Sequence, residues 1–188
     1  KKRGRPMNIW GHFRTITQHK LLVMKACFYV GLYKQGLLHD LSKYSPSEFG
    51  VGCRYFQGTR SPNNAQREAE GCSTAWLHHK GRNKHHYEYW MDYSTRPEDG
   101  ICGMKMPDRY IYEMFLDRIA ASKTYQKDKY TDCSPLEYYE KGNSEQFLHP
   151  YTKKVLEKLL HMLAEEGEKR TFVYLKRVIR QKKKEHRL

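Results

Sequence analysis

Paired cysteines, long apolar runs and a secretory signal are all missing from this sequence. Its five cysteines are widely spaced, odd in number and without a CxxC pair, which excludes a disulfide framework and a zinc ribbon. The most apolar stretch, LLVMKACFYVGLY, is interrupted by Lys25 and is shorter than the ~20 residues of a bilayer span. The opening KKRGRP leads into a polar segment, unlike a signal peptide. We therefore expect a soluble, cytoplasmic protein without a membrane segment.

Strand-like alternation and internal repeats are also missing, whereas apolar residues recur at helical spacing in several segments. We expect an all-α fold. The expected helices cover 15–34, a short segment from 37, a helix starting at 45, and 108–122, 152–165 and 169–183. Residues 50–63, 92–107 and 123–150 are expected to be turns or loops.

Positive charge is concentrated at the two ends of the chain. The formal net charge is +14, but KKRGR at the start has four basic residues, and residues 168–188 have nine Lys/Arg against two Glu. We predict three parts: residues 1–6 as a tag or disordered basic arm, 7–167 as the catalytic domain, and 168–188 as a basic C-terminal helix or tail. The basic ends permit a nucleic-acid partner but do not require one, since solvated tails explain them equally.

Two short motifs indicate how the chain is divided locally. The run SPSE predicts a helix start, with Ser45 as the N-cap, Pro46 in the first turn and Glu48 as the capping-box partner. The dipeptide His39–Asp40 therefore falls between two helices. In HHKGRNKHH, residues 78–86, Gly81 and Asn83 predict a bend between two pairs of histidines.

Histidines and carboxylates occur where they would be buried together. His19 lies on the apolar stripe of its expected helix, and Asp117 lies among the apolar residues of 108–122. Taken singly, a hydrogen-bonded core histidine or an aspartate paired with arginine is the commoner explanation. Burying so many ionisable groups without a shared purpose would be costly, and imidazole and carboxylate are good ligands for divalent metals. The candidate ligands are His19, His39, Asp40, His78, His79, His85, His86 and Asp117.

One stretch adds a family resemblance to this pattern. HDLSK, residues 39–43, resembles the HDxxK signature of the HD-domain superfamily of metal-dependent phosphohydrolases, matching at His39, Asp40 and Lys43. The runs HKLLVMKACFYVGLYKQGLLHDLSKYSPSEF, AWLHHKGRNKHHYEYW and MPDRYIYEMFLDRIAASKTY resemble a small branch of it in bacteria and phages, a domain of unknown function. The resemblance covers roughly residues 7–180.

The resemblance implies an HD-domain-like helical bundle with a metal site in its centre. It implies metal ligation by His19, His39, Asp40 and Asp117, with further ligands from His78, His79, His85 and His86. Which of those four bind, and whether one ion or two are held, stays open, because the later histidines of the superfamily are usually further apart. The ligand types do not distinguish Mn, Fe, Co, Ni and Zn.

The function expected from the resemblance is hydrolysis of a phosphomonoester or phosphodiester, most simply of a nucleotide, by a metal-activated water. Asp40 and Lys43 are the expected catalytic residues. Lys43, Arg82 and Asn83 are the expected substrate-binding residues, since positive charge beside a metal attracts phosphate. Two alternatives stay open: a di-iron oxygenase on the same scaffold, and a non-catalytic metal-stabilised binding protein that docks a partner through its basic ends.

Overall fold

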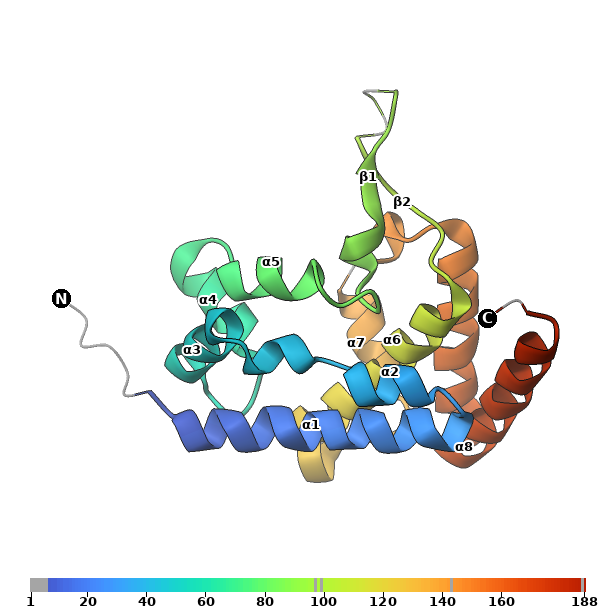
Figure 1. The fold of residues 1–188 in the computed structure, drawn as a ribbon, viewed down its shortest axis with the longest axis horizontal. Helices are drawn as coiled ribbons and strands as arrows, with labels where there is room; N and C mark the ends of the chain where they lie inside the picture. Colours follow the sequence, from blue (N-terminus) through green and yellow to red (C-terminus); the bar gives the residue numbers. More distant parts are fainter. Residues whose placement is uncertain (1–6, 97, 99, 143, 187) are drawn as a thin grey trace.

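The computed structural model describes residues 7–188 except 97, 99, 143 and 187, so the predicted arm at residues 1–6 lies outside the described residues. The described chain is built from α-helices joined by short 3-10 turns, with one small hairpin (Figure 1). The helices are α1 (Ile9–Val30), α2 (Tyr33–Leu38), α3 (Pro46–Tyr55), α4 (Pro62–Glu70), α5 (Thr74–Lys80), α6 (Asp108–Gln126), α7 (Ser134–Lys141) and α8 (Pro150–Lys184). The predicted all-α fold class is confirmed. None of the helices in the described part is both long and apolar enough to cross a membrane.

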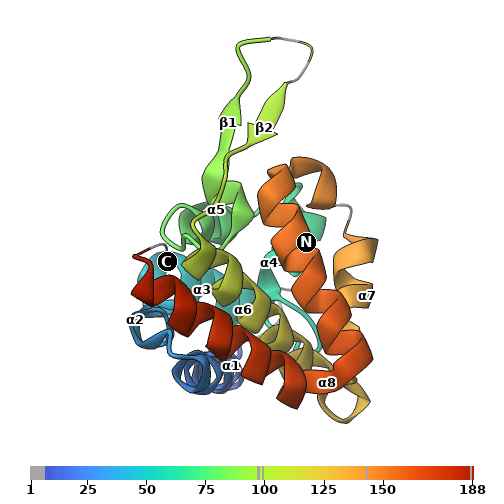
Figure 2. The ribbon, with the colours of Figure 1, turned by 90° about the vertical axis from the view of Figure 1, so that its right-hand side faces the viewer.

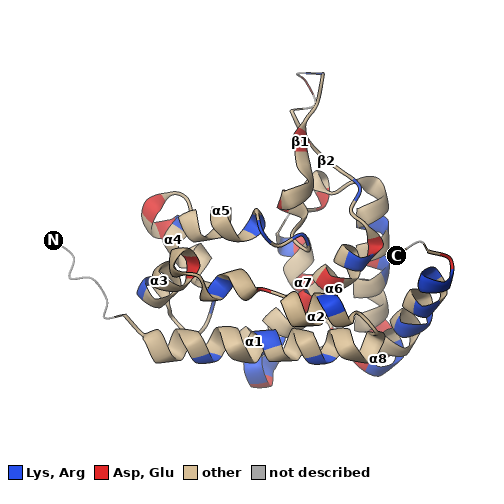
Figure 3. Ribbon diagram, viewed as in Figure 1, with Lys and Arg blue, Asp and Glu red and all other residues tan. Residues whose placement is uncertain are grey.

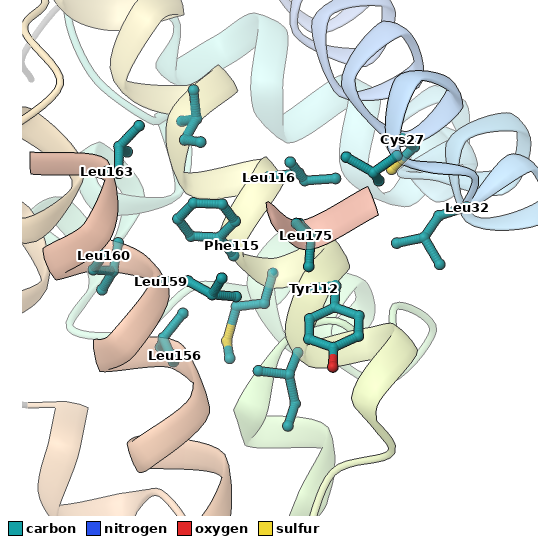
Figure 4. Packing of buried hydrophobic residues seen from close by; sticks show 14 of the residues in the cluster. Cys27, Leu32, Tyr112, Phe115, Leu116, Leu156, Leu159, Leu160, Leu163 and Leu175 are labelled. Carbon is teal, nitrogen blue, oxygen red and sulfur yellow. The ribbon is translucent and has the colours of Figure 1, made fainter. Parts of the chain in front are cut away.

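Helix α6 runs through the centre of the bundle and is buried around most of its circumference. The consecutive residues Met114, Phe115 and Leu116 have almost no exposed surface, although neighbouring side chains on a helix point about 100° apart. Leucines of α8 and residues of α1 pack against them in one continuous cluster (Figure 4). Because α6 is buried on most sides, the ionisable side chains on this helix are buried or partly buried.

Helix α1 presents one buried stripe to this core. The stripe has the spacing of a helix face and consists of His12, Ile16, His19, Val23, Cys27 and Val30. Asn8 caps the first turn by accepting a hydrogen bond from the Gly11 amide at 2.8 Å. The helix ends at Val30 and is capped by Gly31, whose φ of 93° is left-handed, so the end predicted at residue 34 was four residues too late.

Three segments expected to be turns or loops have regular structure, and the expectation was wrong for part of 123–150, which contains α7. Helix α3 continues through Gly50 and Gly52 to Tyr55, so the turn expected from residue 50 was wrong. Strand β1 (Met91–Tyr93) pairs antiparallel with β2 (Ile101–Gly103) inside the expected loop 92–107. The resulting hairpin projects from the helical body (Figure 2). Three-residue strands are too short to show alternation in sequence.

Helix α8 is divided into two arms at Gly167, whose φ of 79° and ψ of 166° are not helical. The second arm packs against the rest of the protein through Phe172, Leu175 and Ile179, which are buried in the main hydrophobic cluster. Lys and Arg residues line its outer side (Figure 3). The basic segment after residue 168 is thus a packed helix as far as Lys184.

Candidate metal centre

Seven of the eight predicted metal ligands lie together, although they come from five separate parts of the chain. The residues are His19 on α1, His39 and Asp40 after α2, His79 on α5, His85 and His86 after α5, and Asp117 on α6. Their nitrogen and oxygen atoms form two groups of four, each within 4.8 Å, and Asp40 belongs to both. The buried interior of the bundle therefore contains a compact set of metal-binding atoms.

The backbone at His39 and Asp40 explains how two adjacent residues face the same centre. Helix α2 ends at Leu38, and His39 is extended, with φ −51° and ψ 126°. Asp40 is left-handed, with φ 55°, a conformation that aspartate tolerates better than most residues. Lys20 holds this segment by donating hydrogen bonds from Nζ to the carbonyl oxygens of Leu37 and His39, both at 2.8 Å.

The first group of four surrounds Oδ2 of Asp40. Nε2 of His39 lies 3.3 Å from this oxygen, and Nε2 of His19 lies 3.5 Å from it. Oδ1 of Asp117 lies 2.9 Å from Nε2 of His19 and 3.5 Å from Nε2 of His39. Two imidazoles and two carboxylates thus converge on one point.

The second group of four surrounds the other oxygen, Oδ1, of Asp40. Nε2 of His79 lies 3.2 Å from Oδ1, and Nε2 of His85 lies 3.4 Å from it. Nε2 of His86 completes the group at 2.9 Å from Nε2 of His79. The carboxylate of Asp40 lies between the two groups, as a ligand bridging two ions would.

Glu113 orients one histidine from each group. It lies one helical turn before Asp117 on α6, and its Oε1 is 2.9 Å from Nδ1 of His39 and 3.2 Å from Nδ1 of His85. A carboxylate beside Nδ1 keeps the proton on that nitrogen and leaves the lone pair of Nε2 free for a metal. His39, His85 and Glu113 themselves form a third group of possible ligand atoms.

Glu48 plays the same part for His79. Its Oε2 lies 2.7 Å from Nδ1 of His79, and its Oε1 lies 2.7 Å from Nδ1 of His78. The predicted capping box is therefore wrong in one respect: Ser45 is the N-cap of α3, but its side chain makes no capping bond and Glu48 serves the histidines instead. His78 is not in either group of four, and its described contact is with Glu48.

Burial and neighbouring charges shift the pKa values of these groups strongly. Burial alone would raise the pKa of Asp40, but His39, Lys43 and His79 hold it well below its usual range. Burial opposes the charged form of His39, yet Asp40, Asp117 and Glu113 raise its pKa. The pKa of His86 is well below the ordinary value, because of burial and of His85 and His79 beside it. The carboxylates are thus charged near neutral pH.

Several atoms at the centre are left without hydrogen-bond partners in the described structure. Both carboxylate oxygens of Asp40 and Nε2 of His85 are buried and unpaired by hydrogen-bond geometry, although Nζ of Lys43 lies 2.5 Å from Oδ2. If the proton of His85 is on Nδ1, as Glu113 favours, its Nε2 lone pair faces a carboxylate that has no proton either. A cation between them would remove this repulsion, so the residues present fit a bound metal.

The three predicted substrate-binding residues have different surroundings. The ammonium of Lys43 contacts Asp40 and its side chain is 27% exposed, so it lies at the edge of the centre. Asn83 is buried and donates to Ser42 Oγ and to the carbonyl of His79, both at 2.8 Å. Arg82 lies on the outer side of the same loop, with Nη1 3.3 Å from the carbonyl oxygen of His78.

Sequence reasoning missed three residues that support the centre: Lys20, Glu48 and Glu113. One signal was available for Glu113, because it precedes Asp117 by four residues and so lies on the same face of α6. Glu48 fits the capping-box motif SPSE, and this motif accounts for a glutamate at position 48 without any contact to a histidine. Lys20 bonds only to backbone oxygens, which leaves no pattern in sequence.

Comparisons with curated proteins and with solved structures found no match. A family model does match residues 8–162, which include every donor of both groups of four. Membership of the HD-domain superfamily stays a prediction. The match covers most of the chain, and the protein belongs to the family of unknown function DUF5662.

Proposed function

We propose that this protein is a metal-dependent phosphohydrolase that cleaves a phosphomonoester or phosphodiester, with nucleotides as the expected substrate class. The observation that supports this best is the position of Asp40, whose two oxygens face two different groups of Nε2 atoms. This arrangement suits a pair of divalent ions sharing one carboxylate. Two ions a few ångströms apart are a recurrent device for phosphoryl transfer.

The donors divide into two sets of residues that would each hold one ion. His19, His39 and Asp117 would hold the first, and His79, His85 and His86 the second, with Asp40 shared. A divalent ion bound there would supply a water of lowered pKa and polarise a phosphoryl oxygen. Imidazole and carboxylate donors are compatible with Mn, Fe, Co, Ni and Zn.

Exposure indicates the side from which substrate would enter. The side chains of His39 and Asp40 are 0% and 2% exposed, whereas Asp117 is 15% and Lys43 is 27% exposed. Asp117 and Lys43 therefore mark the open edge of the centre. The second group also has one partly exposed donor, His86.

Lys43 is suited to bind the phosphoryl group at this edge. Burial would lower the pKa of its ammonium, but Asp40 and Asp117 raise it, so the side chain stays charged at neutral pH. Its Nζ lies beside Oδ2 of Asp40 and remains partly open to solvent. It would donate hydrogen bonds to a non-bridging oxygen and stabilise negative charge in the transition state.

The test combines elemental analysis of the purified protein with a panel of phosphomonoesters and phosphodiesters. We expect about two divalent ions per chain and hydrolysis of at least one ester. Lys43→Met should retain the metal and lower kcat by roughly 100-fold, because it removes a donor to the developing charge. Lys80, which is partly exposed at the end of α5, provides the matched control, and Lys80→Met should leave kcat unchanged.

A protein that binds no metal, or whose hydrolysis survives Asp40→Ala, would refute the proposal. The two alternatives predict different results in the same samples. A di-iron oxygenase would contain iron and consume oxygen with its substrate. A metal-stabilised binding protein would contain metal without hydrolysing any ester in the panel.

A further inference from the structure

A second, cationic cavity lies beside the metal centre. It has a volume of about 160 Å³ and lies where α2, the loop after α5 and the start of α6 come together. Lys34, Arg82 and Lys84 contribute three positive charges to its lining, and Tyr110 contributes an aromatic ring. Arg82 and Asn83, which the sequence suggested as substrate-binding residues, line this cavity, whereas the hydrolysis proposed above uses Lys43.

The cavity is separated from the metal centre by Glu113. Tyr110, Glu113 and Asp117 lie at successive turns along one face of α6. The cavity is lined by Tyr110 and Glu113, while Asp117 belongs to the metal centre. His85 lies between them, with Nδ1 towards Glu113 and Nε2 towards Asp40. His85 also lines the cavity, so a ligand there would lie beside this histidine, whose Nε2 points towards Asp40.

The charge of the cavity is not balanced by its own carboxylate. Glu113 is the acidic residue of the lining, and its Oε1 already faces two imidazoles. Among the described contacts, Arg82 reaches the carbonyl oxygen of His78 and Lys84 lies 5.4 Å from the centre of the Tyr89 ring. Neither contact cancels a charge. Three cations around one concavity attract an anion.

The size of the cavity limits what that anion is. At about 160 Å³ the cavity is small. Pockets for whole drug-sized ligands are typically about 300–1,000 Å³. The space therefore suits a phosphate or diphosphate group, with any attached organic part outside the cavity.

We propose that this cavity is a phosphate-binding site, distinct from the metal centre, for inorganic phosphate or for the phosphate group of a larger ligand. Lys34 and Lys84 would contact the anion from opposite elements, α2 and the loop after α5. The aromatic pair of Tyr110 and Trp90, whose ring centres are 5.9 Å apart, lies next to the cavity. The proposal does not depend on hydrolysis at the metal centre.

The test measures binding of inorganic phosphate by calorimetry in the full chain carrying Asp40→Asn, which removes the charge shared by both metal-binding groups. We expect one phosphate per chain. The added pair Lys34→Gln and Lys84→Gln should weaken its binding at least tenfold, since each removes a charge-assisted hydrogen bond. The matched control, Lys169→Gln with Arg170→Gln, removes the same charge from exposed positions on α8 and should change the affinity less than twofold.

Trp90 provides a second measurement that reports the location. Its indole nitrogen donates a hydrogen bond to the carbonyl oxygen of Lys84 at 2.8 Å, so an anion that draws Lys84 inward should change its fluorescence. Titrations with diphosphate and with a nucleoside monophosphate separate the two sources of the phosphate group. Tighter binding of the nucleotide would identify a nucleotide site, and equal or weaker binding a free-phosphate site. No binding, or equal losses in the cavity variant and the control, would overturn the proposal.

Discussion

Oε1 of Glu113 lies 2.9 Å from Nδ1 of His39, and the same oxygen lies 3.2 Å from Nδ1 of His85. These histidines belong to different groups of metal-binding atoms. A single carboxylate behind the centre therefore favours the proton on Nδ1 in one histidine of each group. Replacing such a supporting group typically lowers metal affinity by about 10- to 100-fold, although the group does not touch the ion.

Glu113→Gln should weaken binding of both ions by roughly 10- to 100-fold, because an amide holds the Nδ1 protons less strongly than a carboxylate. Glu48→Gln should weaken the second ion by a similar factor and leave the first unchanged, since Glu48 contacts His79 of the second group. A calorimetric titration with metal distinguishes weaker binding of both ions from weaker binding of the second ion alone. Equal effects of both variants on both ions would contradict this division of roles.

Metal stoichiometry should follow the two groups of donors. We expect about one ion per chain in Asp117→Ala, which loses a donor of the first group alone, and none in Asp40→Ala, which loses the shared carboxylate. His78→Ala is the control and should retain both ions, because His78 lies outside both groups. Elemental analysis gives the counts, and circular dichroism checks that the helices persist.

Two glycines of α3 should respond in opposite directions to the same substitution. A Cβ at Gly52 would lie 2.1 Å from Nε2 of the buried His12, whereas a Cβ at Gly50 would meet nothing within 4 Å. Gly52→Ala should therefore cost about 2 kcal/mol of unfolding free energy or more, by overpacking. Gly50→Ala should gain about 0.5–1 kcal/mol from helix propensity. Urea unfolding measures both, and equal shifts would contradict the packing of α1 on α3.

His12 should make the protein less stable in mild acid. Burial, with a smaller effect of Lys43, lowers its pKa to about 4. Between pH 6.5 and 4 the unfolded chain binds a proton that the folded chain does not, so stability falls as the pH falls through this window. His12→Gln should reduce the loss between pH 7.5 and 5 by about 1–2 kcal/mol. Urea unfolding at both values tests this, and an unchanged loss would contradict it.

The sequence predicted the centre better than its supports, for a physical reason. His19 and Asp117 lie on helix faces whose apolar spacing already indicated the interior, and α1 and α6 place them there. Glu48 and Glu113 act through a histidine, and only Glu113 has a helical spacing relative to a ligand, four residues before Asp117. His78 and His79 could not be separated in sequence, because only the direction of α5 turns His79 inward.

The fold was predictable where helices are long and less so where tertiary contacts decide. The apolar period of α6 identified that helix closely. Residues 50–55 looked like a turn because of their glycines, yet Gly52 is needed inside a helix for the approach of His12. Strands β1 and β2 support each other across a hairpin, and three residues are too few for a pattern.

The ligands are dispersed over the chain from His19 to Asp117, and no local segment contains a complete set. On a growing polypeptide the donors of the second group are all present once His86 has been made, whereas the first group is complete only after α6 has been synthesised and has docked against α1. If the chain binds two ions as proposed, the pair is completed late in biogenesis, after most of the topology exists.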